Sequence, residues 1–265
     1  MLTARQHKER DLYCRTTSSS TQGQALRKFI VLLLIGFAGW ACADELRWGF
    51  ASVDGIPYVE VHAQQLRGGF IYELGRQVSQ QLGYQAAFVE TPNKRIDEFM
   101  QRGRIHVICN NNPQWMGNPA RYRWSAPLYS EEDVLLTHSQ HAPINSLQDL
   151  YGKNLGTQLG YVYDSALMDA FATKKINRQN LRDQNAGLNL LRKQRLDAII
   201  NMHRTLRFQM NLHKEAPLRI NTWVINRYDM HCTYSPLLPV SAERLDNALL
   251  QLRDQGLINK LLNDS

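Results

Sequence analysis

The sequence predicts an α/β protein of two lobes, because two separate series of alternating strands and helices can be read along it. Between the two series lies Arg123-Trp-Ser-Ala-Pro-Leu-Tyr129, an aromatic corner containing proline, and behind it a short apolar strand at residues 134–137. We predict that this stretch carries the chain from one lobe into the other. The two sets of strands are expected to form separate sheets, with a ligand bound between the lobes.

Composition and charge favour a folded protein without a nucleic-acid partner. The chain has 265 residues, of which 43% are hydrophobic and 21% are charged, enough apolar material for a substantial core. Its formal net charge is +7, but six Lys or Arg and only two acidic residues fall within the first 28 positions. The rest of the chain is therefore weakly basic, and it has no Lys- or Arg-rich run of the kind that binds nucleic acid.

Residues 27–43 have the layout of a secretory signal. The basic pair Arg27-Lys28 precedes an apolar run at residues 29–37 and the small-x-small site Ala41-Cys42-Ala43. The apolar run is too short to span a bilayer of roughly 30 Å. We predict export with cleavage after Ala43, and lipidation of Cys42 is the alternative. Residues 1–26 are interpreted as an unusually long basic region of the signal, and a translation start assigned too early is the alternative.

Export bears on the two cysteines of the mature chain, Cys109 and Cys232. In an oxidising compartment such a pair is a candidate disulfide, with two buried free thiols as the alternative. The sequence has no CxxC or HExxH motif and no His/Cys cluster with metal-ligand spacing. We therefore expect no metal and no other cofactor.

The first lobe is predicted to be a parallel sheet with helices on both faces. Its best-defined helix covers residues 70–83, because Phe70, Leu74, Val78 and Leu82 recur at every fourth position and Gly83 is a typical stop. The other expected elements are strands at 45–50, 84–89 and 105–109 and a helix at 95–102.

The loop after the third of these strands is a candidate ligand-binding segment. It reads Asn110-Asn-Asn-Pro-Gln-Trp115 and lies beyond the end of a buried strand, where open α/β sheets bind ligands. A plain polar turn would also use Asn and Pro, but such a turn has no need for a group as large as Trp115.

The second lobe repeats the alternation. A turn at Gly160 opens a helix and exposes backbone N–H groups, and residues 201–203 follow a strand end, so both places are predicted to face the ligand. The expected strands lie at 154–158 and 196–200, and the expected helices at 164–172 and around 188–191. The chain then returns through predicted strands at 222–225 and 230–234 and ends in two helices, around 245–252 and 257–261.

The order of these pieces resembles the bacterial extracellular solute-binding proteins of the polar amino acid type, family 3. Residues 123–129 are similar to the family's F-S-x-P-Y corner with one residue added. Leu147-Gln-Asp-Leu-Tyr-Gly-Lys153 and Leu155-Gly-Thr-Gln-Leu-Gly160 are similar to its L-x-D-L-x-G-K and V-G-V-Q-x-G motifs. Weaker matches are Gly69-Phe-Ile-Tyr-Glu-Leu74, Arg195-Leu-Asp-Ala198 and Arg253-Asp-Gln-Gly256.

The resemblance implies a two-lobed, type II periplasmic-binding-protein-like fold with two crossing hinge strands. Lobe 1 would comprise residues 44–137 and 225–265, and lobe 2 residues 138–224. It also implies that Cys109 and Cys232 lie on neighbouring strands of lobe 1, close enough for a disulfide. The implied function is a periplasmic, monomeric protein that closes on a small polar or aromatic, amino-acid-like solute. The implied partner is an inner-membrane permease, that of an ABC importer, or a receptor.

The resemblance transfers the binding residues only in part. An arginine clamps the ligand carboxylate in the family, and Arg121 is the candidate here. The family's acidic residue for the ligand amino group is replaced by Asn201-Met-His203, which disfavours an ordinary α-amino acid and favours a flat or apolar-bodied solute. The predicted ligand contacts are Tyr58, Phe70, Asn110, Asn112, Trp115 and Arg121 from lobe 1, and Tyr161, Tyr163, Asn201 and His203 from lobe 2.

Two other functions fit the same predicted fold. A ligand-sensing subunit would present its bound state to a membrane receptor. A periplasmic dehydratase of the cyclohexadienyl dehydratase type would need an acid and a base in the cleft, for which Glu73, His203 and Asp164 are the candidates. Since Glu73 and Asp164 have ordinary helix-surface and helix-start explanations, we expect binding without catalysis.

Overall fold

The computed structural model describes residues 44–181, 184–214 and 216–263. The predicted signal segment and its cleavage site after Ala43 lie outside the described residues. The strands are β1 (Glu45–Phe50), β2 (Glu60–His62), β3 (Gln65–Gly68), β4 (Gln85–Glu90), β5 (Val107–Asn111), β6 (Arg123–Trp124), β7 (Tyr129–His138), β8 (Asn154–Gln158), β9 (Asn177–Leu181), β10 (Ala198–Met202), β11 (Leu218–Ile220) and β12 (Asn226–Tyr234). The α-helices are α1 (Phe70–Leu82), α2 (Ile96–Gln101), α3 (Ser165–Ala172), α4 (Gln184–Arg192), α5 (His203–Leu212), α6 (Ala242–Asp254) and α7 (Leu257–Asn263).

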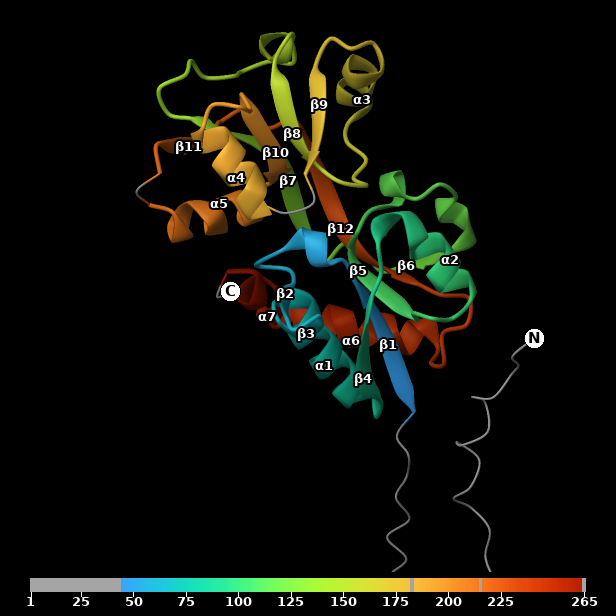
Figure 1. Cartoon of the computed structure of the whole chain (residues 1–265). Helices are drawn as coiled ribbons and strands as arrows, with labels where there is room; N and C mark the ends of the chain where they lie inside the picture. The colour runs from blue at the N-terminus through green and yellow to red at the C-terminus, as the bar shows by residue number, and fades with distance from the viewer. Residues whose placement is uncertain (1–43, 182–183, 215, 264–265) are drawn as a thin grey trace, which may run out of the picture. The chain divides into compact units, whose positions relative to one another are not determined.

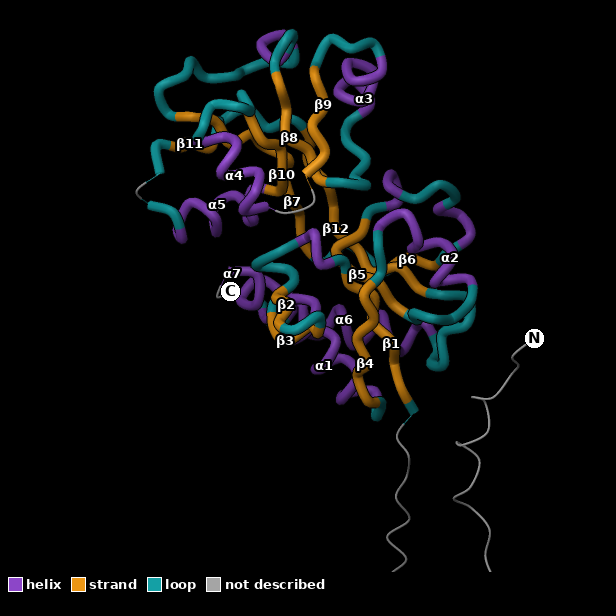
Figure 2. Tube along the Cα trace, viewed as in Figure 1, coloured by secondary structure: helices purple, strands orange, loops and turns teal. Residues whose placement is uncertain are grey.

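The strands form two parallel groups joined by two long antiparallel strands. In the first lobe β1 pairs in parallel with β4 and β5, and in the second lobe β8 pairs in parallel with β9 and β10. The two long strands, β7 and β12, run from one group to the other (Figures 1 and 2). The predicted two-lobed α/β fold with two crossing strands is confirmed. The exact limits of the lobes, at 137/138 and 224/225, stay a prediction.

The expectation of two separate sheets is wrong. The hydrogen-bonded order is continuous, β4-β1-β5-β12-β7-β10-β8-β9, with β6 and β11 paired to β12 and β7. The continuity arises because the crossing strands pair with each other, residues 129–133 of β7 against residues 226–230 of β12. Each strand then continues into its own lobe, where β7 pairs with β10 and β12 pairs with β5.

The core of the first lobe covers both faces of its sheet. The predicted stripe on α1 is buried, and Gly83 ends that helix with φ 83°, a left-handed conformation that suits glycine. Gly75 allows close packing, because a Cβ there would lie 2.7 Å from the Phe88 ring. On the opposite face Phe99 and Met100 of α2 pack with Ile105 and Ile108.

The second lobe is built in the same way. Alternate residues of its strands point to opposite faces, as a pleated strand requires. Leu135 and Ile200 pack with Leu167 of α3 on one face. On the other face, residues from β7 and β10 pack with α4 and α5 in a cluster that contains Leu136, Ile199, Leu191 and Leu206.

Several elements differ from the sequence prediction. Residues 222–225 are not a strand, and β12 begins only at Asn226. The hairpin β2–β3, strand β9 and helix α5 were not predicted. Strand β9 reads Asn-Arg-Gln-Asn-Leu and lies at the sheet edge, where its side chains are largely exposed and leave no apolar pattern.

The predicted cysteine pair forms a disulfide between Cys109 on β5 and Cys232 on β12. These strands are antiparallel neighbours, so the bond joins one strand of the first lobe to a crossing strand. Both cysteines are buried. In the described part of the chain, no helix combines the length and apolar character needed for a bilayer span.

The disulfide should stabilise the fold measurably. The loop that it closes spans 123 positions, and a loop of that length corresponds to about 2–5 kcal/mol in the chain-entropy model. We expect a reductant to lower the thermal midpoint of the wild-type protein. The double variant Cys109→Ala/Cys232→Ala serves as the control, because its midpoint should not respond to the reductant. An equal response of both proteins would contradict a structural disulfide.

Candidate functional site

A cavity of about 70 Å³ lies between the lobes, at the carboxyl ends of β1, β5 and β8. This is the edge where parallel α/β sheets bind ligands. The first lobe contributes most of the wall, and the second lobe contributes the loop after β8. The lining residues are Phe50, Ala51, Asp54, Ile71, Asn93, Ile96, Ile108, Cys109, Asn110, Asn111, Trp115, Met116, Gly160, Tyr161 and Val162.

Asp54 is the acidic residue of the cavity wall. It ends a short 3-10 turn after β1 and accepts hydrogen bonds from the Tyr161 hydroxyl and, at 3.3 Å, from the Asn110 amide. The residue as a whole is half-buried, but its carboxyl group is enclosed by these partners. Burial raises the pKa of Asp54 to about 6, against the lowering effect of both hydrogen bonds. No described Lys, Arg or His forms an ion pair with Asp54.

The contact between Asp54 and Tyr161 is one of several across the cleft. The side chain of Gln184 on α4 donates to the backbone carbonyls of Val53, at 3.3 Å, and Asp54, at 3.2 Å. The loop after β1 is therefore held by two separate places in the second lobe.

Trp115 and Tyr161 contribute aromatic rings to the cavity wall, and each packs against a second ring that does not line it. The Trp115 ring meets the Tyr228 ring edge-on, with centroids 5.0 Å apart, and Tyr161 lies 6.3 Å from Tyr163 by the same measure. The indole Nε1 of Trp115 is buried and has no acceptor within hydrogen-bond geometry. These rings give the site apolar faces with a few polar edges, as small-molecule sites require.

A second acidic group, Asp133, lies on β7 and is 5% exposed. It accepts a hydrogen bond of 3.0 Å from the Tyr228 hydroxyl and forms no ion pair with a described residue. Burial raises the pKa of Asp133 to about 7, with a further contribution from the charge of Glu131. The charge of Asp133 in turn contributes to the raised pKa values of Tyr161 and Tyr163, after the larger effect of burial.

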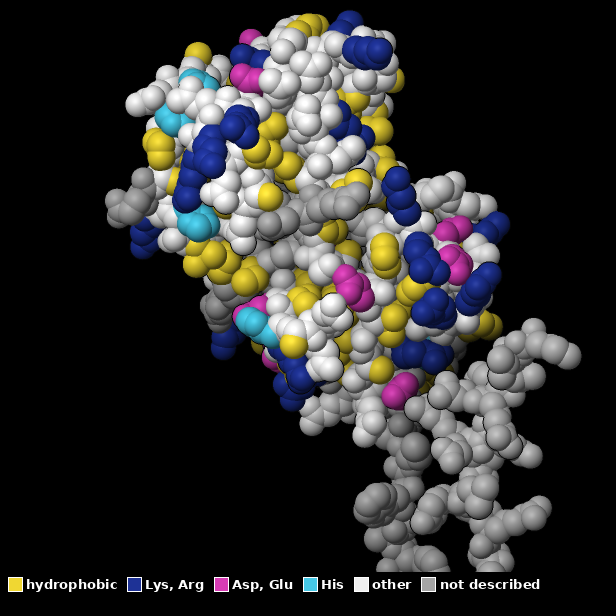
Figure 3. Space-filling model, in the orientation of Figure 1, with side chains coloured by type: hydrophobic (Ala, Val, Ile, Leu, Met, Phe, Trp, Pro, Cys, Tyr) yellow, Lys and Arg dark blue, Asp and Glu magenta, His cyan; other side chains and the backbone are white. Residues whose placement is uncertain are grey.

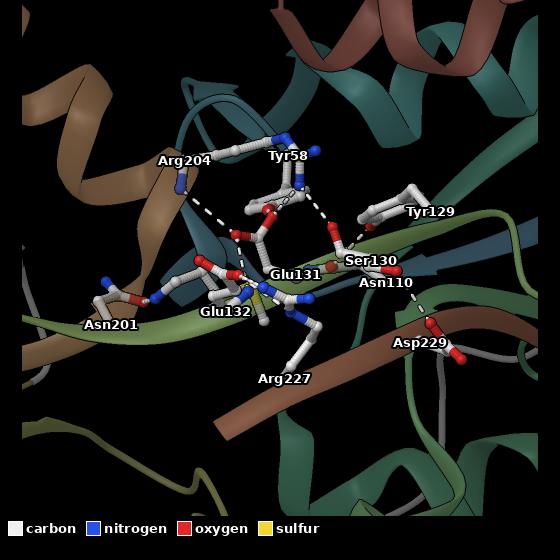
Figure 4. Close-up of polar contacts among 11 residues, drawn as sticks. Tyr58, Asn110, Tyr129, Ser130, Glu131, Glu132, Asn201, Arg204, Arg227 and Asp229 are labelled. Carbon is white, nitrogen blue, oxygen red and sulfur yellow. Dashed lines mark hydrogen bonds and ion pairs between the residues drawn. The ribbon is translucent and has the colours of Figure 1, made fainter. Parts of the chain in front are cut away.

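Glu131, also on β7, has a cationic partner in Arg204, whereas no residue in the described part of the chain forms an ion pair with Asp54 or Asp133. Its carboxylate is 2% exposed and accepts hydrogen bonds from the Tyr58 hydroxyl and the Arg204 guanidinium (Figure 4). The backbone N–H of Arg204, in the first turn of α5, also donates to Glu131, at 3.4 Å. Glu131 thus joins the first lobe, a crossing strand and a helix of the second lobe.

The structure brings three of the predicted ligand contacts together in the cavity wall: Asn110, Trp115 and Tyr161. Asn110 has φ 56° at the end of β5 and accepts from the Tyr129 hydroxyl at 2.8 Å, so its amide is fixed between Tyr129 and Asp54. Ligand contact by these three residues stays a prediction, with a shared location in its favour.

The other predicted contacts do not line this cavity. Tyr58 and Phe70 are buried in the first-lobe core around Tyr129, and Asn112 holds the turn after β5 by accepting from the Gln114 backbone. Arg121 is exposed and pairs with Asp97 of α2 at 3.8 Å.

Among the second-lobe residues, Tyr163 is buried and its hydroxyl accepts from the Gln158 backbone at 2.8 Å. Asn201 accepts from the Met202 backbone, and His203 is the first residue of α5. Their contact with a ligand also stays a prediction.

Sequence reasoning missed Asp54, Asp133, Glu131 and Arg204. Asp54 stands beside Gly55 in a sequence typical of a turn, and nothing local points to Tyr161, 107 positions away. The described residues contain no group of three or more His, Cys, Asp or Glu side chains arranged to hold a metal.

Comparison with known proteins supports the fold more strongly than it supports any particular ligand. No protein-family profile matches the chain. Among curated proteins, the chain is similar to a "Probable histidine-binding protein" of Campylobacter jejuni, with 24% identity over 132 residues. The aligned region covers 50% of each protein, so the match spans about half the length of that relative.

Solved structures match over most of the chain. An ancestral arginine-binding protein bound to glutamine has a TM-score of 0.69 at 18% identity, covering 83% of this chain and 96% of that one. The GluR0 ligand-binding core in complex with L-glutamate has a TM-score of 0.70 at 14% identity, and the match covers 85% of this chain and 99% of that one. The ancestral amino acid-binding protein AncCDT-1, a precursor of cyclohexadienyl dehydratase, has a TM-score of 0.67 at 18% identity. That match covers 83% of this chain and 94% of the other. At these identities the likeness establishes a shared fold.

The buried carboxyl of Asp133 should cost stability when it is ionised. Its pKa is raised in the folded state, so the cost is absent below pH 4, grows as pH rises, and is complete above pH 7. We expect Asp133→Asn to raise the free energy of unfolding by about 1–3 kcal/mol at pH 8 and to have little effect at pH 4. Denaturant titrations at both pH values measure this, with Asp169→Asn on the exposed face of α3 as the control. A variant that loses more stability at pH 8 than at pH 4 would show that the carboxylate is favourable, and an equal change at both pH values would contradict a cost of ionisation.

Two adjacent glutamates allow a matched test of the buried ion pair between Glu131 and Arg204. Glu131→Gln leaves Arg204, which is only 24% exposed, without its anion, and we expect a loss of about 2–4 kcal/mol. Glu132→Gln breaks the pair with Arg227 on the outer side of the same strand, where we expect a loss under about 1 kcal/mol. Both losses in the free energy of unfolding are measured by denaturant titration at pH 7.5. Similar losses in the two variants would argue against a special role for Glu131.

Proposed function

We propose that this protein is a periplasmic solute-binding protein that closes on a small, polar or aromatic, amino-acid-like solute and delivers it to an inner-membrane ABC importer. The observation that carries the proposal is the cavity between the lobes. It is walled by both lobes, lies at the carboxyl ends of their strands, and places a carboxylate, amides and aromatic rings around one space. A protein that holds its ligand between two lobes linked by two strands can couple binding to closure.

The site favours binding over catalysis. The three candidate catalytic groups do not meet: Glu73 is on the partly exposed face of α1 beside Arg76, Asp164 caps α3 by accepting from Ala166, and His203 begins α5. Since none of them lines the cavity, an acid and base acting on one bound substrate find no support there.

The remaining parts of the proposal rest on the sequence and on the neighbours. The signal-like segment at residues 27–43 supports export, and binding proteins for amino acids share the fold. On the face drawn in Figure 3, Lys and Arg side chains lie over both lobes with Asp and Glu among them, which does not favour a nucleic-acid surface. We propose that the protein acts as a monomer.

A thermal-shift screen of the exported protein tests the function. The library should contain amino acids, amines, small acids, sugars and aromatic metabolites. A ligand at a hundred times its dissociation constant adds about 2.7 kcal/mol, which corresponds to a rise of roughly 5–10 °C for a protein of this size. If no member of the library raises the midpoint, the proposed function fails.

Substitutions in the wall should weaken binding of the ligand found in this way. We expect Trp115→Ala and Tyr161→Ala each to raise Kd by about 10-fold or more, because each removes an aromatic face of the cavity. Arg121→Gln decides whether the family's carboxylate clamp operates, and since Arg121 is exposed beside Asp97 we expect less than a twofold change. Isothermal titration calorimetry measures all three. Unchanged affinity in both wall variants would place the ligand elsewhere.

A further inference from the structure

The charges of the cavity wall restrict the chemical class of the ligand more narrowly than the fold does. Of the described residues that line the cavity, Asp54 carries the only carboxyl group, and none is Lys, Arg or His. A wall with one carboxylate and no cation favours a positively charged occupant.

We propose that the ligand is a small organic cation, an amine or guanidine with a flat or apolar body and no carboxylate, whose charged group is bound by Asp54. This rests on the proposed function, since it concerns the same cavity. It departs from the ligands named for the structural neighbours, because arginine, glutamine and glutamate all carry an α-carboxylate.

The first argument is charge compensation. The donors to the Asp54 carboxyl within the described residues, Tyr161 and Asn110, are both neutral, and a carboxylate enclosed by protein without a cation is unfavourable. Burial raises its pKa to about 6, so the group is mostly ionised at pH 7.5. Asp133, a second carboxylate with no described cationic partner, lies near enough for its charge to act on Tyr161. A ligand cation bound beside Asp54 would supply the charge compensation that this carboxylate lacks.

The second argument is the aromatic wall. Trp115 and Tyr161 both line the cavity, and aromatic faces attract ammonium and guanidinium groups as well as flat apolar bodies. To a carboxylate these rings offer a neutral donor, the unpaired indole N–H of Trp115, and no positive charge to replace its water.

The third argument is that the basic side chains near the cavity either already have hydrogen-bond or ion-pair partners or lie outside its wall. Arg178 lines an adjoining cavity, but its guanidinium already donates to Thr157, to Asn180 and, at 3.1 Å, to the Tyr161 carbonyl. Arg204 pairs with Glu131, and Lys94 is exposed in the adjoining cavities. None lies in the wall beside Asp54 to clamp an α-carboxylate.

Amino acids and their decarboxylated amines provide the test, because each pair differs only in the carboxylate. Tyramine with tyrosine, histamine with histidine and agmatine with arginine are titrated into the exported protein at pH 7.5 by calorimetry. We expect at least one amine to bind, and to bind at least 10-fold more tightly than its amino acid. The proposal is overturned if no amine binds, or if the amino acid of each binding pair matches its amine.

A variant assigns the effect to Asp54. Asp54→Asn keeps the size of the side chain and removes its charge, and it should weaken binding of that amine by about 10- to 100-fold. Asp54→Glu should retain part of the affinity, and Asp169→Asn, on the exposed face of α3, should retain all of it. Far-ultraviolet circular dichroism and the thermal midpoint verify that each variant is folded. Unchanged amine affinity in folded Asp54→Asn overturns the assignment.

The two proposals fail in different ways. If the thermal-shift library yields an amino acid, acid or sugar as ligand while the amines do not bind, solute binding stands and the cationic ligand is rejected. If neither the library nor the amines bind, the proposed function itself fails.

Discussion

The pairing of β7 with β12 is the constraint on which the rest of the structure depends. Both connections between the lobes pass through this ladder of residues 129–133 and 226–230. Because side chains alternate along a strand, Tyr129, Glu131 and Asp133 point inward from β7, while Ser130 is exposed and Glu132 is only partly covered. The strand that links the lobes therefore carries two buried carboxylates between them, and the neighbouring elements are arranged around these charges.

The two charges are handled differently. Glu131 is neutralised by Arg204 and further held by Tyr58, so it binds three parts of the chain together. Among the described residues, the Asp133 carboxyl accepts a hydrogen bond from the Tyr228 hydroxyl alone, and the Asp54 carboxyl accepts from Tyr161 and Asn110 alone. Arg204 thus compensates the charge of Glu131, whereas the carboxyl groups of Asp54 and Asp133 have no cationic partner among the described residues. Such an arrangement is less stable than it could be, a common feature of binding sites.

The sequence predicted the frame of the molecule well where an apolar period repeats. The stripe on α1, the strands β1 and β8 and the closing helices α6 and α7 follow from local spacing alone. Strand β7 was recognised only from residue 134 onward, because Ser130-Glu-Glu-Asp133 reads as a polar turn. Those residues are tolerated inside because their partners come from far along the chain: Tyr58 and Arg204 lie 73 positions from Glu131, and Tyr228 lies 95 from Asp133. No local pattern signals such partners, and Asp54, Glu131 and Asp133 were missed for the same reason. Asn110, Trp115 and Tyr161 were predicted because they follow the ends of strands.

The disulfide has a consequence for how the lobes can move. Cys109 is itself part of the cavity wall, and its bond to Cys232 fixes that wall covalently to β12. The part of β12 beyond residue 232 therefore travels with the first lobe as one rigid piece. Any rotation that opens the cleft has to be absorbed before Cys232, in the few peptide units of β12 that pair with β7. The bond thus limits the part of β12 that can bend to the residues before Cys232. Opening then becomes a rotation about a narrow axis and not a bending spread along the strand.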